Sequence, residues 1–360
     1  MKKYMKAAVL AEPGKMLVKE VPIPKTIPGW VRIQTKAVGI CGSDMHRYKG
    51  NYIQLDKDKK DLEREFLGKI YGHEVSGIVE KIGEGVTKFN TGDRVVLMPP
   101  YPCMVCKYCK VGLYQVCDNL KIIGYDYQGG FAEYLIVPEN NLFKIPKNIS
   151  YEEAAFLDVV AVGIHAVNLA NISIADRVLI VGAGAIGLTT AALVKKAGAR
   201  KVFITAKHEI QKNIAKKLGV DIVLDSQNDD VLSKIYKKTG SMGVDCVLES
   251  IGVSQKVMQF ALEAVRKRGR IVFIGLYEEL VCLNFSKLLS KEASIIGSAA
   301  YGMWDLTSEF ELAVEILSKE EIPVKDMITH KFSIDDINEA FQQKLAKDKR
   351  SRTIKVVIVF

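Results

Sequence analysis

The sequence predicts an α/β protein in which a mainly β half is followed by a doubly wound parallel sheet. From residue 9 to about residue 137, short apolar runs are broken by glycine, proline and aspartate, as is typical of strands joined by turns. From about residue 152, strand-like runs alternate with helical stretches, which is typical of a parallel sheet with crossover helices. The 360 residues are enough for two domains of ordinary size.

The first half is expected to consist of strands. Each of its main apolar runs is bounded by turn residues, and these runs are WVRIQTKAVGI, GIVEKIGEGV, GDRVVLMP and GGFAEYLIVP. Residues 54–66, QLDKDKKDLEREF, form a charge run between the first two of them. We expect this run to be an exposed surface excursion.

The second half begins with a long helical pattern over residues 151–170. The strand-like runs that follow it, most of them separated by helical stretches, are RVLIVG, KVFITA, DIVLD, VDCVLES and RIVFIG. The chain then continues through a helical region and ends in a strand-like run, RTIKVVIVF.

Composition and charge exclude several classes of function. The chain is 48% hydrophobic and 26% charged, which is ordinary for a soluble protein with a sizeable core. Its net charge of +9 is spread over lysine-rich helices, so we expect a solvated surface and no nucleic-acid partner. The basic N-terminus lacks the apolar region of a signal peptide. The uncharged run over residues 178–194 is slightly short for a membrane span, and we expect a cytoplasmic protein without membrane contact.

A glycine-rich turn follows the first strand-like run of the second half. Gly182, Gly184 and Gly187 form the pattern G-x-G-x-x-G where an apolar run meets an alanine- and leucine-rich helix. They permit a tight turn, a close approach of a pyrophosphate and close packing of helix on strand. The helix start, at Ala185 and Ile186, supplies N–H groups for the phosphates. The alternative is that these glycines serve packing alone.

The end of the next strand-like run bears on the choice of cofactor. An NAD site usually carries Asp or Glu there, whereas this chain has Ala206, followed by Lys207 and His208. A carboxylate would repel a 2′-phosphate, and basic residues, Lys212 among them, could pair with one. The sequence therefore favours NADP over NAD. The alternative is that these basic residues are merely exposed loop residues.

Four of the seven cysteines lie close together in the sequence. Cys103, Cys106, Cys109 and Cys117 have the spacing of an all-cysteine zinc site, in which four thiolates form a closed tetrahedral shell. A reducing cytosol disfavours disulfides, and an iron–sulfur cluster is a further alternative. Because a closed shell leaves no position for a substrate, this site would brace a loop, and catalysis must take place elsewhere.

A second set of metal ligands comes from distant stretches of the chain. Cys41 and His73 are suitable for a catalytic zinc, which needs three protein ligands and one open position. Asp158 is the candidate third ligand, because an unpartnered carboxylate in an apolar helical run would be costly. Glu74 is a candidate fourth ligand or a neighbour of the ligands. The alternatives are a core thiol for Cys41 and a helix cap or salt bridge for Asp158.

These motifs together resemble those of the zinc-dependent medium-chain alcohol and polyol dehydrogenases. GHEVSGIVEKIGEGV matches the zinc signature of that family, and CGSDMH, the four-cysteine lobe, GGFAEY and GAGAIG occur in the family's order. The likeness covers nearly the whole chain. It implies a GroES-like, mainly β catalytic domain over residues 1–158 with a zinc lobe at about residues 100–118, a Rossmann cofactor domain over residues 159–297, and a return to the catalytic domain over residues 298–360.

The resemblance also implies roles for the candidate residues. Cys41, His73 and the position of Asp158 would bind a catalytic zinc, with Glu74 adjacent to it or in its shell, and the four cysteines would bind a structural zinc. Two departures matter. Aspartate stands at a position that is often Cys or Glu in the family, and Ala206 stands where members that use NAD are usually acidic.

The implied reaction transfers a hydride between a secondary hydroxyl of a polyol or sugar alcohol and a nicotinamide cofactor. Ser43 and His46 match the positions of the family's proton relay. The carboxylate at the third ligand position favours the polyol branches, such as sorbitol and galactitol-phosphate dehydrogenases. A secondary alcohol, butanediol and threonine are alternative substrates, and a non-catalytic nucleotide-binding relative is a remote alternative. By analogy, the chain would form a homodimer or homotetramer, with the strand near residues 270–276 at the sheet edge and in the subunit contact.

Overall fold

The computed structural model describes residues 2–50, 67–227, 230–252, 254–277, 280–345 and 353–360. The chain forms two compact units. The β-rich unit comprises Met1–Asp158, Asp305–Lys347 and Lys355–Phe360, and the parallel-sheet unit comprises Val159–Trp304 and Asp348–Ile354. The predicted surface excursion over residues 54–66 lies outside the described residues.

The β-rich unit is built mainly on antiparallel pairing, with its last two strands as a parallel pair. Its strands are β1 (Tyr4–Glu12), β2 (Lys15–Pro22), β3 (Trp30–Gly39), β4 (Glu74–Ile82), β5 (Arg94–Leu97), β6 (Pro100–Tyr101), β7 (Lys121–Ile122), β8 (Tyr134–Pro138), β9 (Leu142–Lys144), β17 (Thr307–Ser308), β18 (Ile328–Ser333) and β19 (Lys355–Val359). Its helices are α1 (Gly42–Tyr48), α3 (Tyr151–Ala154), α10 (Glu309–Ser318) and α11 (Ile337–Leu345), with single turns η1 (Cys109–Val111), η2 (Tyr114–Val116), η3 (Glu139–Asn141), η4 (Val324–Met327) and η5 (Ile334–Asp336).

The main sheet of this unit joins distant parts of the chain. Its strand order is β18-β19-β3-β4-β5-β9, with β8 also paired to β3. Strand β3 lies between the C-terminal strand β19 and β4, and its Gly39 pairs with Val357 on one side and with Glu74 on the other. Alternate residues of β3, such as Val31 and Ile33, are fully buried, as expected for a strand with one face on a core.

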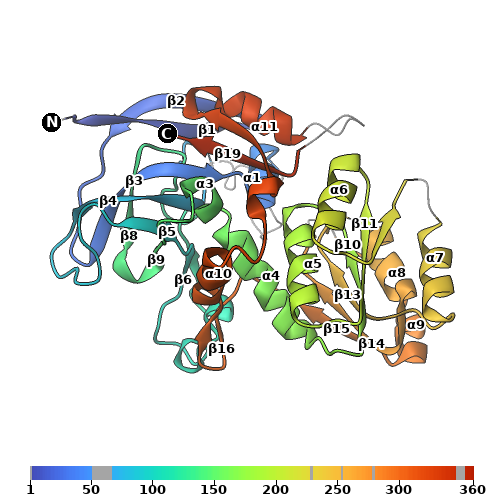
Figure 1. Cartoon of the computed structure of the whole chain (residues 1–360). Coiled ribbons are helices and arrows are strands. Elements are labelled where there is room, and N and C mark those ends of the chain that lie inside the picture. The colour runs from blue at the N-terminus through green and yellow to red at the C-terminus, as the bar shows by residue number, and fades with distance from the viewer. Residues whose placement is uncertain (1, 51–66, 228–229, 253, 278–279, 346–352) are drawn as a thin grey trace. The chain divides into compact units, whose positions relative to one another are not determined.

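The parallel-sheet unit is a doubly wound α/β fold. Its elements are α4 (Leu157–Ala170), which begins in the β-rich unit, then β10 (Arg177–Val181), α5 (Ala185–Lys196), β11 (Lys201–Ala206), α6 (Glu209–Lys217), β12 (Ile222–Asp225), α7 (Val231–Thr239), β13 (Val244–Glu249), α8 (Gln255–Ala264), β14 (Val265–Phe273), α9 (Phe285–Lys291), β15 (Ser294–Gly297) and β16 (Met303–Trp304). The sheet order is β12-β11-β10-β13-β14-β15, and every pair is parallel. Helices lie on both sides of the sheet (Figure 1).

The order of these strands creates the position at which such sheets bind ligands. From β10 the chain winds outward to β11 and β12, and it then returns to β13 on the other side of β10. Ligands bind beyond the carboxyl ends of the strands at this kind of reversal. The glycine-rich turn over residues 182–187 directly follows β10 and therefore lies at that position.

Two sequence expectations are refined by the structure. The uncharged run over residues 178–194 forms β10, the glycine turn and most of α5. The helical pattern over residues 151–170 is divided into α3 and α4. Tyr151–Ala170 is nevertheless long and apolar enough to pass for a membrane span, and 78% of its most apolar window is buried, as in the core helix of a globular protein.

The expectation that the strand near residues 270–276 lies at the sheet edge is wrong. This strand is β14, and β15 pairs with its outer side. Strand β15 has only four residues, most of them exposed, so it lacks the long apolar run by which a buried strand is recognised.

Candidate active site and metal centres

Three potential metal ligands meet where β3 ends and β4 begins. The Cys41 thiol, a His73 ring nitrogen and a Glu74 carboxylate oxygen all lie within 4.8 Å of one another. Cys41 is the N-cap residue of α1, and Glu74 is the first residue of β4. His73 and Glu74 are buried, and Cys41 is partly buried. A thiol, an imidazole and a carboxylate in this arrangement are a suitable donor set for Zn²⁺.

An unpaired polar atom in the cluster supports this fit. Within the described residues, Glu74 Oε1 is buried and has no hydrogen-bond partner. Buried polar atoms are normally paired, so such atoms call for a ligand or ion. Asp158, in the first turn of α4, places Oδ2 3.9 Å from His73 Nε2. The structure thus brings Cys41, His73 and Glu74 together, whereas Asp158, the predicted third ligand, lies beside His73 but outside the group whose ligand atoms are all within 4.8 Å of one another.

Asp44 braces two members of this cluster. Its Oδ2 accepts a hydrogen bond from the backbone N–H of Cys41 at 2.9 Å, and its Oδ1 lies 3.7 Å from His73 Nδ1. Asp44 is buried on α1. Metal-binding histidines usually pair their second ring nitrogen with a carboxylate or carbonyl, which fixes the ring. Asp44 is in the position to do this for His73.

Lys355 is a neighbour of the cluster that sequence reasoning missed. Its ammonium forms an ion pair with the Glu74 carboxylate, and both side chains are buried, with 3% and 0% of their surface exposed. The pair reaches across Gly39 of β3, where a Cβ atom would overlap the Glu74 carboxylate. Burial lowers the pKa of Lys355, but Glu74 and Cys41 outweigh burial and raise it above its ordinary value. The only signal in the sequence is a single lysine within the apolar terminal strand.

The predicted relay residues lie on α1, directly after Cys41. Ser43 and His46 are three residues apart, so they lie on the same side of the helix, and both are partly exposed. The Ser43 hydroxyl accepts a hydrogen bond from the Tyr125 hydroxyl. Burial raises the pKa of Tyr125, so its phenol stays protonated and remains the donor. Sequence reasoning missed Tyr125, which lies between the cysteine lobe and GGFAEY but belongs to neither motif.

The four cysteines of the lobe between β6 and β7 form a second cluster. Their sulfur atoms all lie within 4.8 Å of one another, and all four are free thiols. Backbone N–H groups point at the sulfurs, including those of Cys103 to Cys117 Sγ at 3.2 Å and of Asn119 to the same sulfur at 3.4 Å. Hydrogen bonds from the backbone of Cys109 and Asp118 lower the pKa of Cys106 to about 6. This favours the thiolate of Cys106, the form that binds metal, whereas burial raises the pKa of Cys109 to about 12.

The glycine turn has the geometry that a dinucleotide site requires. Gly182 has a φ of +100°, and a Cβ atom on Gly187 would overlap the Gly182 carbonyl. The N–H of Gly182 donates to Thr205 Oγ1 at 2.9 Å, which holds the turn against β11. Gly184 is the N-cap of α5, and Ala185 and Ile186 open that helix. The N–H groups of this first turn are suited to bind phosphate.

A carboxylate lies beside the end of β11, although it belongs to the neighbouring strand and could not be recognised from the sequence of β11. Ala206 pairs in register with Asp225 of β12. Lys212 is bound there, with Nζ 2.7 Å from Asp225 Oδ2 and 2.7 Å from Glu209 Oε1. Lys207 is exposed, and its backbone N–H donates to Gln211 Oε1, as does that of His208. Lys212 was predicted to bind a 2′-phosphate, but in the structure its ammonium already pairs with two carboxylates.

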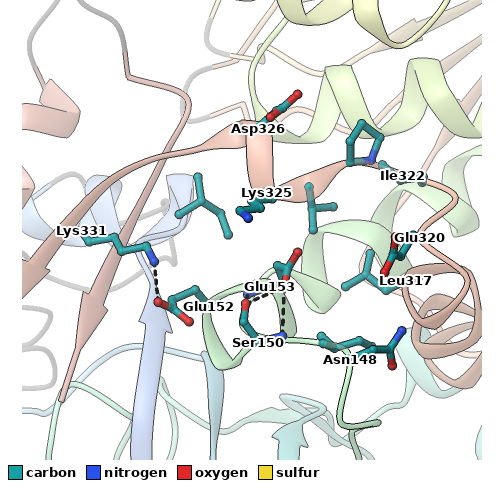
Figure 2. A pocket seen from close by; sticks show the side chains of 14 residues that line it. Asn148, Ser150, Glu152, Glu153, Leu317, Glu320, Ile322, Lys325, Asp326 and Lys331 are labelled. Carbon is teal, nitrogen blue, oxygen red and sulfur yellow. Dashed lines mark hydrogen bonds and ion pairs between the residues drawn. The ribbon is translucent and has the colours of Figure 1, made fainter.

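A cavity of about 680 Å³ lies elsewhere in the β-rich unit (Figure 2). It is lined by residues around α3 and by the segment between α10 and β18. Ion pairs and hydrogen bonds join some of its own polar residues, such as Lys331 with Glu152 and Ser150 with Glu153. None of the metal-ligand candidates lines it, so we do not assign the reaction to this cavity.

A doubly wound sheet with a dinucleotide turn, on the same chain as a metal-ligand cluster and a four-cysteine lobe, defines the class of zinc-binding, nicotinamide-linked dehydrogenases. Two family descriptions match the chain. Residues 27–147 match "Alcohol dehydrogenase GroES-like domain", and residues 185–319 match "Zinc-binding dehydrogenase". The chain belongs to this family of zinc-binding alcohol dehydrogenases.

Individual relatives agree with this assignment. The L-threonine 3-dehydrogenase of Pyrococcus furiosus is 35% identical and covers 92% of both chains. The sorbitol dehydrogenase of Halalkalibacterium halodurans is 32% identical and covers 94% of this chain and 95% of its own. Among solved structures, an oxidoreductase of unknown specificity from Escherichia coli has a TM-score of 0.89 and 30% identity, and covers 99% of both chains.

Two further solved structures contain a cofactor. A zinc-binding dehydrogenase from Sinorhizobium meliloti, bound to NADP, has a TM-score of 0.87 and 27% identity, and covers 100% of both chains. An alcohol dehydrogenase from Escherichia coli, complexed with NADH, has a TM-score of 0.87 and 26% identity, and also covers 100% of both chains. The predicted fold class, the family and the assignment as a dehydrogenase are thereby confirmed.

Proposed function

We propose that this chain oxidises a secondary hydroxyl of a polyol or sugar alcohol to a ketone, with a catalytic zinc and with NADP as the hydride acceptor. The observation that carries the proposal is the cluster of Cys41, His73 and Glu74 with Asp158 beside it. It offers a zinc ion several protein ligands within a family of zinc-binding dehydrogenases.

Three parts of the chain have separate roles in the proposed reaction. Zinc held by the cluster supplies Lewis-acid chemistry to a substrate hydroxyl. Ser43 accepts the proton that leaves this hydroxyl and passes it toward His46, a partly exposed histidine that can release a proton to solvent. The turn over residues 182–187 would hold the pyrophosphate of the cofactor, which would supply the hydride acceptor.

We propose a second, structural zinc in the cysteine lobe. The support is the approach of all four sulfurs to within 4.8 Å and the N–H groups directed at them. Because four thiolates complete a tetrahedral shell, this ion holds the lobe together and has no open position for substrate.

The preference for NADP rests on the end of β11. Ala206 leaves room for a 2′-phosphate, and Lys207 and His208 follow it. Lys207 is exposed and is the first candidate partner, since Lys212 is held by Asp225 and Glu209. The NADP-bound structure from Sinorhizobium meliloti is compatible with this preference.

We also propose the organisation of the whole protein. The catalytic domain would comprise residues 1–158 and 298–360 and the cofactor domain residues 159–297. The two compact units support the boundary after Asp158, although they assign residues 298–304 and 348–354 to the parallel-sheet unit. The free thiols suit a reducing cytoplasm. Small-molecule alcohols and a second copy of the chain are the expected partners, as a homodimer or homotetramer, without nucleic acid or membrane.

The test is the near-ultraviolet absorbance of the reduced cofactor, followed with a panel of polyols, polyol phosphates, diols, secondary alcohols and threonine. Each substrate is offered with NAD and with NADP, before and after a zinc chelator. We expect NADP-linked oxidation of a polyol that the chelator abolishes. Threonine is the second candidate because of the likeness to threonine dehydrogenases. Turnover that persists without zinc would overturn the proposal, and turnover with NAD alone would overturn the preference for NADP.

A further inference from the structure

Tyr125 is fixed beside the candidate metal cluster by three different contacts. Its hydroxyl donates a hydrogen bond to Ser43 Oγ. The guanidinium of Arg47 lies 3.5 Å from the centre of its ring, in a cation–π contact. On another side, its ring meets the His73 imidazole edge to face, with 4.9 Å between the ring centroids. The same side chain therefore touches a candidate metal ligand, the candidate proton acceptor and a neighbouring cation.

The chain is built to bring Tyr125 to this position. The preceding residue, Gly124, has a φ of +97°, which disfavours other residues. A Cβ atom at Gly124 would lie 2.8 Å from the Gly72 carbonyl oxygen and 2.9 Å from His73 Cβ. This loop thus packs directly on the backbone that carries His73, and only a glycine allows so close an approach.

The hydroxyls of Ser43 and Tyr125 form a matched pair. Tyr125 donates its one hydroxyl proton to Ser43, so its oxygen is left as an acceptor. Ser43 retains its own proton and further acceptor capacity. Both residues are partly exposed. Two uncharged oxygens at hydrogen-bond separation correspond to the two adjacent oxygens of a vicinal diol.

We propose that Tyr125 determines substrate specificity by accepting a hydrogen bond from the hydroxyl next to the one that is oxidised, while Ser43 faces the reacting hydroxyl. This inference rests on the proposed function and names the preferred substrates as vicinal diols and polyols. An alcohol with one hydroxyl leaves the Tyr125 oxygen without its partner. A site built around a substrate hydroxyl discriminates against analogues that lack it.

The experiment compares two alcohols that differ by one hydroxyl, propylene glycol and isopropanol. Values of kcat/KM are measured for the wild type, Tyr125→Phe and the control Tyr127→Phe. Tyr127 lies in the same loop and contacts Trp30 and Tyr101 instead. We call the ratio of kcat/KM for propylene glycol to kcat/KM for isopropanol the preference for the diol. Because Tyr125→Phe removes one hydrogen bond, we expect this ratio to fall about tenfold. We expect Tyr127→Phe to leave this preference unchanged.

Calorimetric titration of the zinc- and NADPH-loaded proteins with the same two alcohols measures binding without turnover, because the reduced cofactor cannot accept a hydride. We expect the wild type to bind the diol more tightly and Tyr125→Phe to lose this difference. Equal loss for both alcohols would indicate a merely structural Tyr125 and would overturn the inference, as would a wild type without any preference. If the wild type turns over no alcohol at all, the proposed function fails, while the titration still decides the role of Tyr125.

Discussion

At the scale of single residues, the buried ion pair of Glu74 and Lys355 joins the end of the chain to the candidate metal cluster. An ammonium beside a thiol, an imidazole and two carboxylates balances part of their negative charge. Removing one partner of a buried pair is costly, because the other charge is left unpaired in a medium of low dielectric constant. The same ion pair therefore contributes to the stability of the β-rich unit and to the charge balance of the candidate metal cluster.

We predict that Lys355→Met destabilises the metal-free protein by about 3 kcal/mol, since Glu74 is left buried without its partner. The measurement is urea unfolding with and without zinc. If Glu74 contacts the metal, zinc replaces the positive charge of the lost ammonium. The free energy of unfolding of the variant then differs less from that of the wild type when zinc is bound. The control is Lys331→Met on neighbouring β18, whose ion pair with Glu152 is 53% and 25% exposed and should contribute little. An equal loss of free energy of unfolding in Lys355→Met and Lys331→Met would contradict the prediction.

A second residue of this kind is Asp245, in the parallel-sheet unit. It accepts hydrogen bonds from the Arg177 backbone N–H and from Arg177 Nε, both at 2.8 Å, and from Arg266 Nε at 2.5 Å. Burial alone would raise the pKa of Asp245, but the two arginines outweigh it and lower the pKa to about 2. The ionised carboxylate is therefore favoured in the folded protein.

A lowered carboxyl pKa stabilises the fold at pH values above the ordinary pKa of 3.8, and the contribution is lost as the pH falls toward about 2. We predict that Asp245→Asn lowers the free energy of unfolding by about 2 kcal/mol at neutral pH. Urea unfolding of both proteins should show this difference shrinking below pH about 4. The control is Asp335→Asn, which removes an exposed ion pair with Lys6. A difference that does not depend on pH would contradict the prediction.

At the scale of elements, the motifs that are local in the sequence are the ones whose spacing alone predicts a site, whereas the cluster of Cys41, His73 and Asp158 draws on distant stretches of the chain. The cysteine lobe and the glycine turn each lie within one short stretch, so their spacing alone indicates their chemistry. Lys355 and Tyr125 reach the cluster only through strand pairing and loop packing. The register that places Gly39 between Glu74 and β19 cannot be read from a motif. Asp225 was missed for the same reason, because it pairs with Ala206 from the neighbouring strand.

The cysteine lobe is the element in which metal and stability should be most tightly linked. It carries little regular structure, and several of its apolar side chains, such as Val105 and Val111, are about 70% exposed. A lobe with so little buried apolar surface depends on a cross-link for its order, and a structural zinc supplies one.

We predict that Cys109→Ser lowers both the zinc content and the thermal unfolding temperature, because an incomplete thiolate shell no longer holds the lobe. The measurements are elemental analysis of zinc per chain and a thermal melt. The control is Cys41→Ser, which should also lose zinc and should abolish turnover but should leave the melt nearly unchanged. Identical melts for the two variants would contradict this division of roles between the two sites.

At the scale of the whole molecule, the alternation of strands and helices was enough to predict the parallel sheet but not its edge. Parallel strands that are buried on both faces form continuous apolar runs, which makes β10, β11 and β13 easy to recognise. A short edge strand has no such run. Strand β15 was therefore missed, and β14 took its place in the expected subunit contact.

The open side of β15 is the place to test the proposed homo-oligomer. An edge strand presents unpaired backbone N–H and C=O groups, and proteins commonly cover such edges. Apolar side chains are exposed on β15 and on the preceding helix: Ile295 on β15 is 38% exposed, and Phe285 and Leu289 on α9 are 66% and 74% exposed. A second copy of the chain that continues the sheet would cover the backbone of β15 and bury Ile295.

We predict that Ile295→Lys shifts the protein toward monomers, because two facing copies would each place an unpaired charge in the contact. Sedimentation velocity over a range of protein concentrations measures the shift. The matched control is Ile174→Lys, an equally apolar position in the same unit that is 81% exposed but lies outside the sheet. Dissociation in the first variant and not in the second would support the β15 contact. An unchanged oligomer in Ile295→Lys, or a wild type that sediments as a monomer, would exclude it.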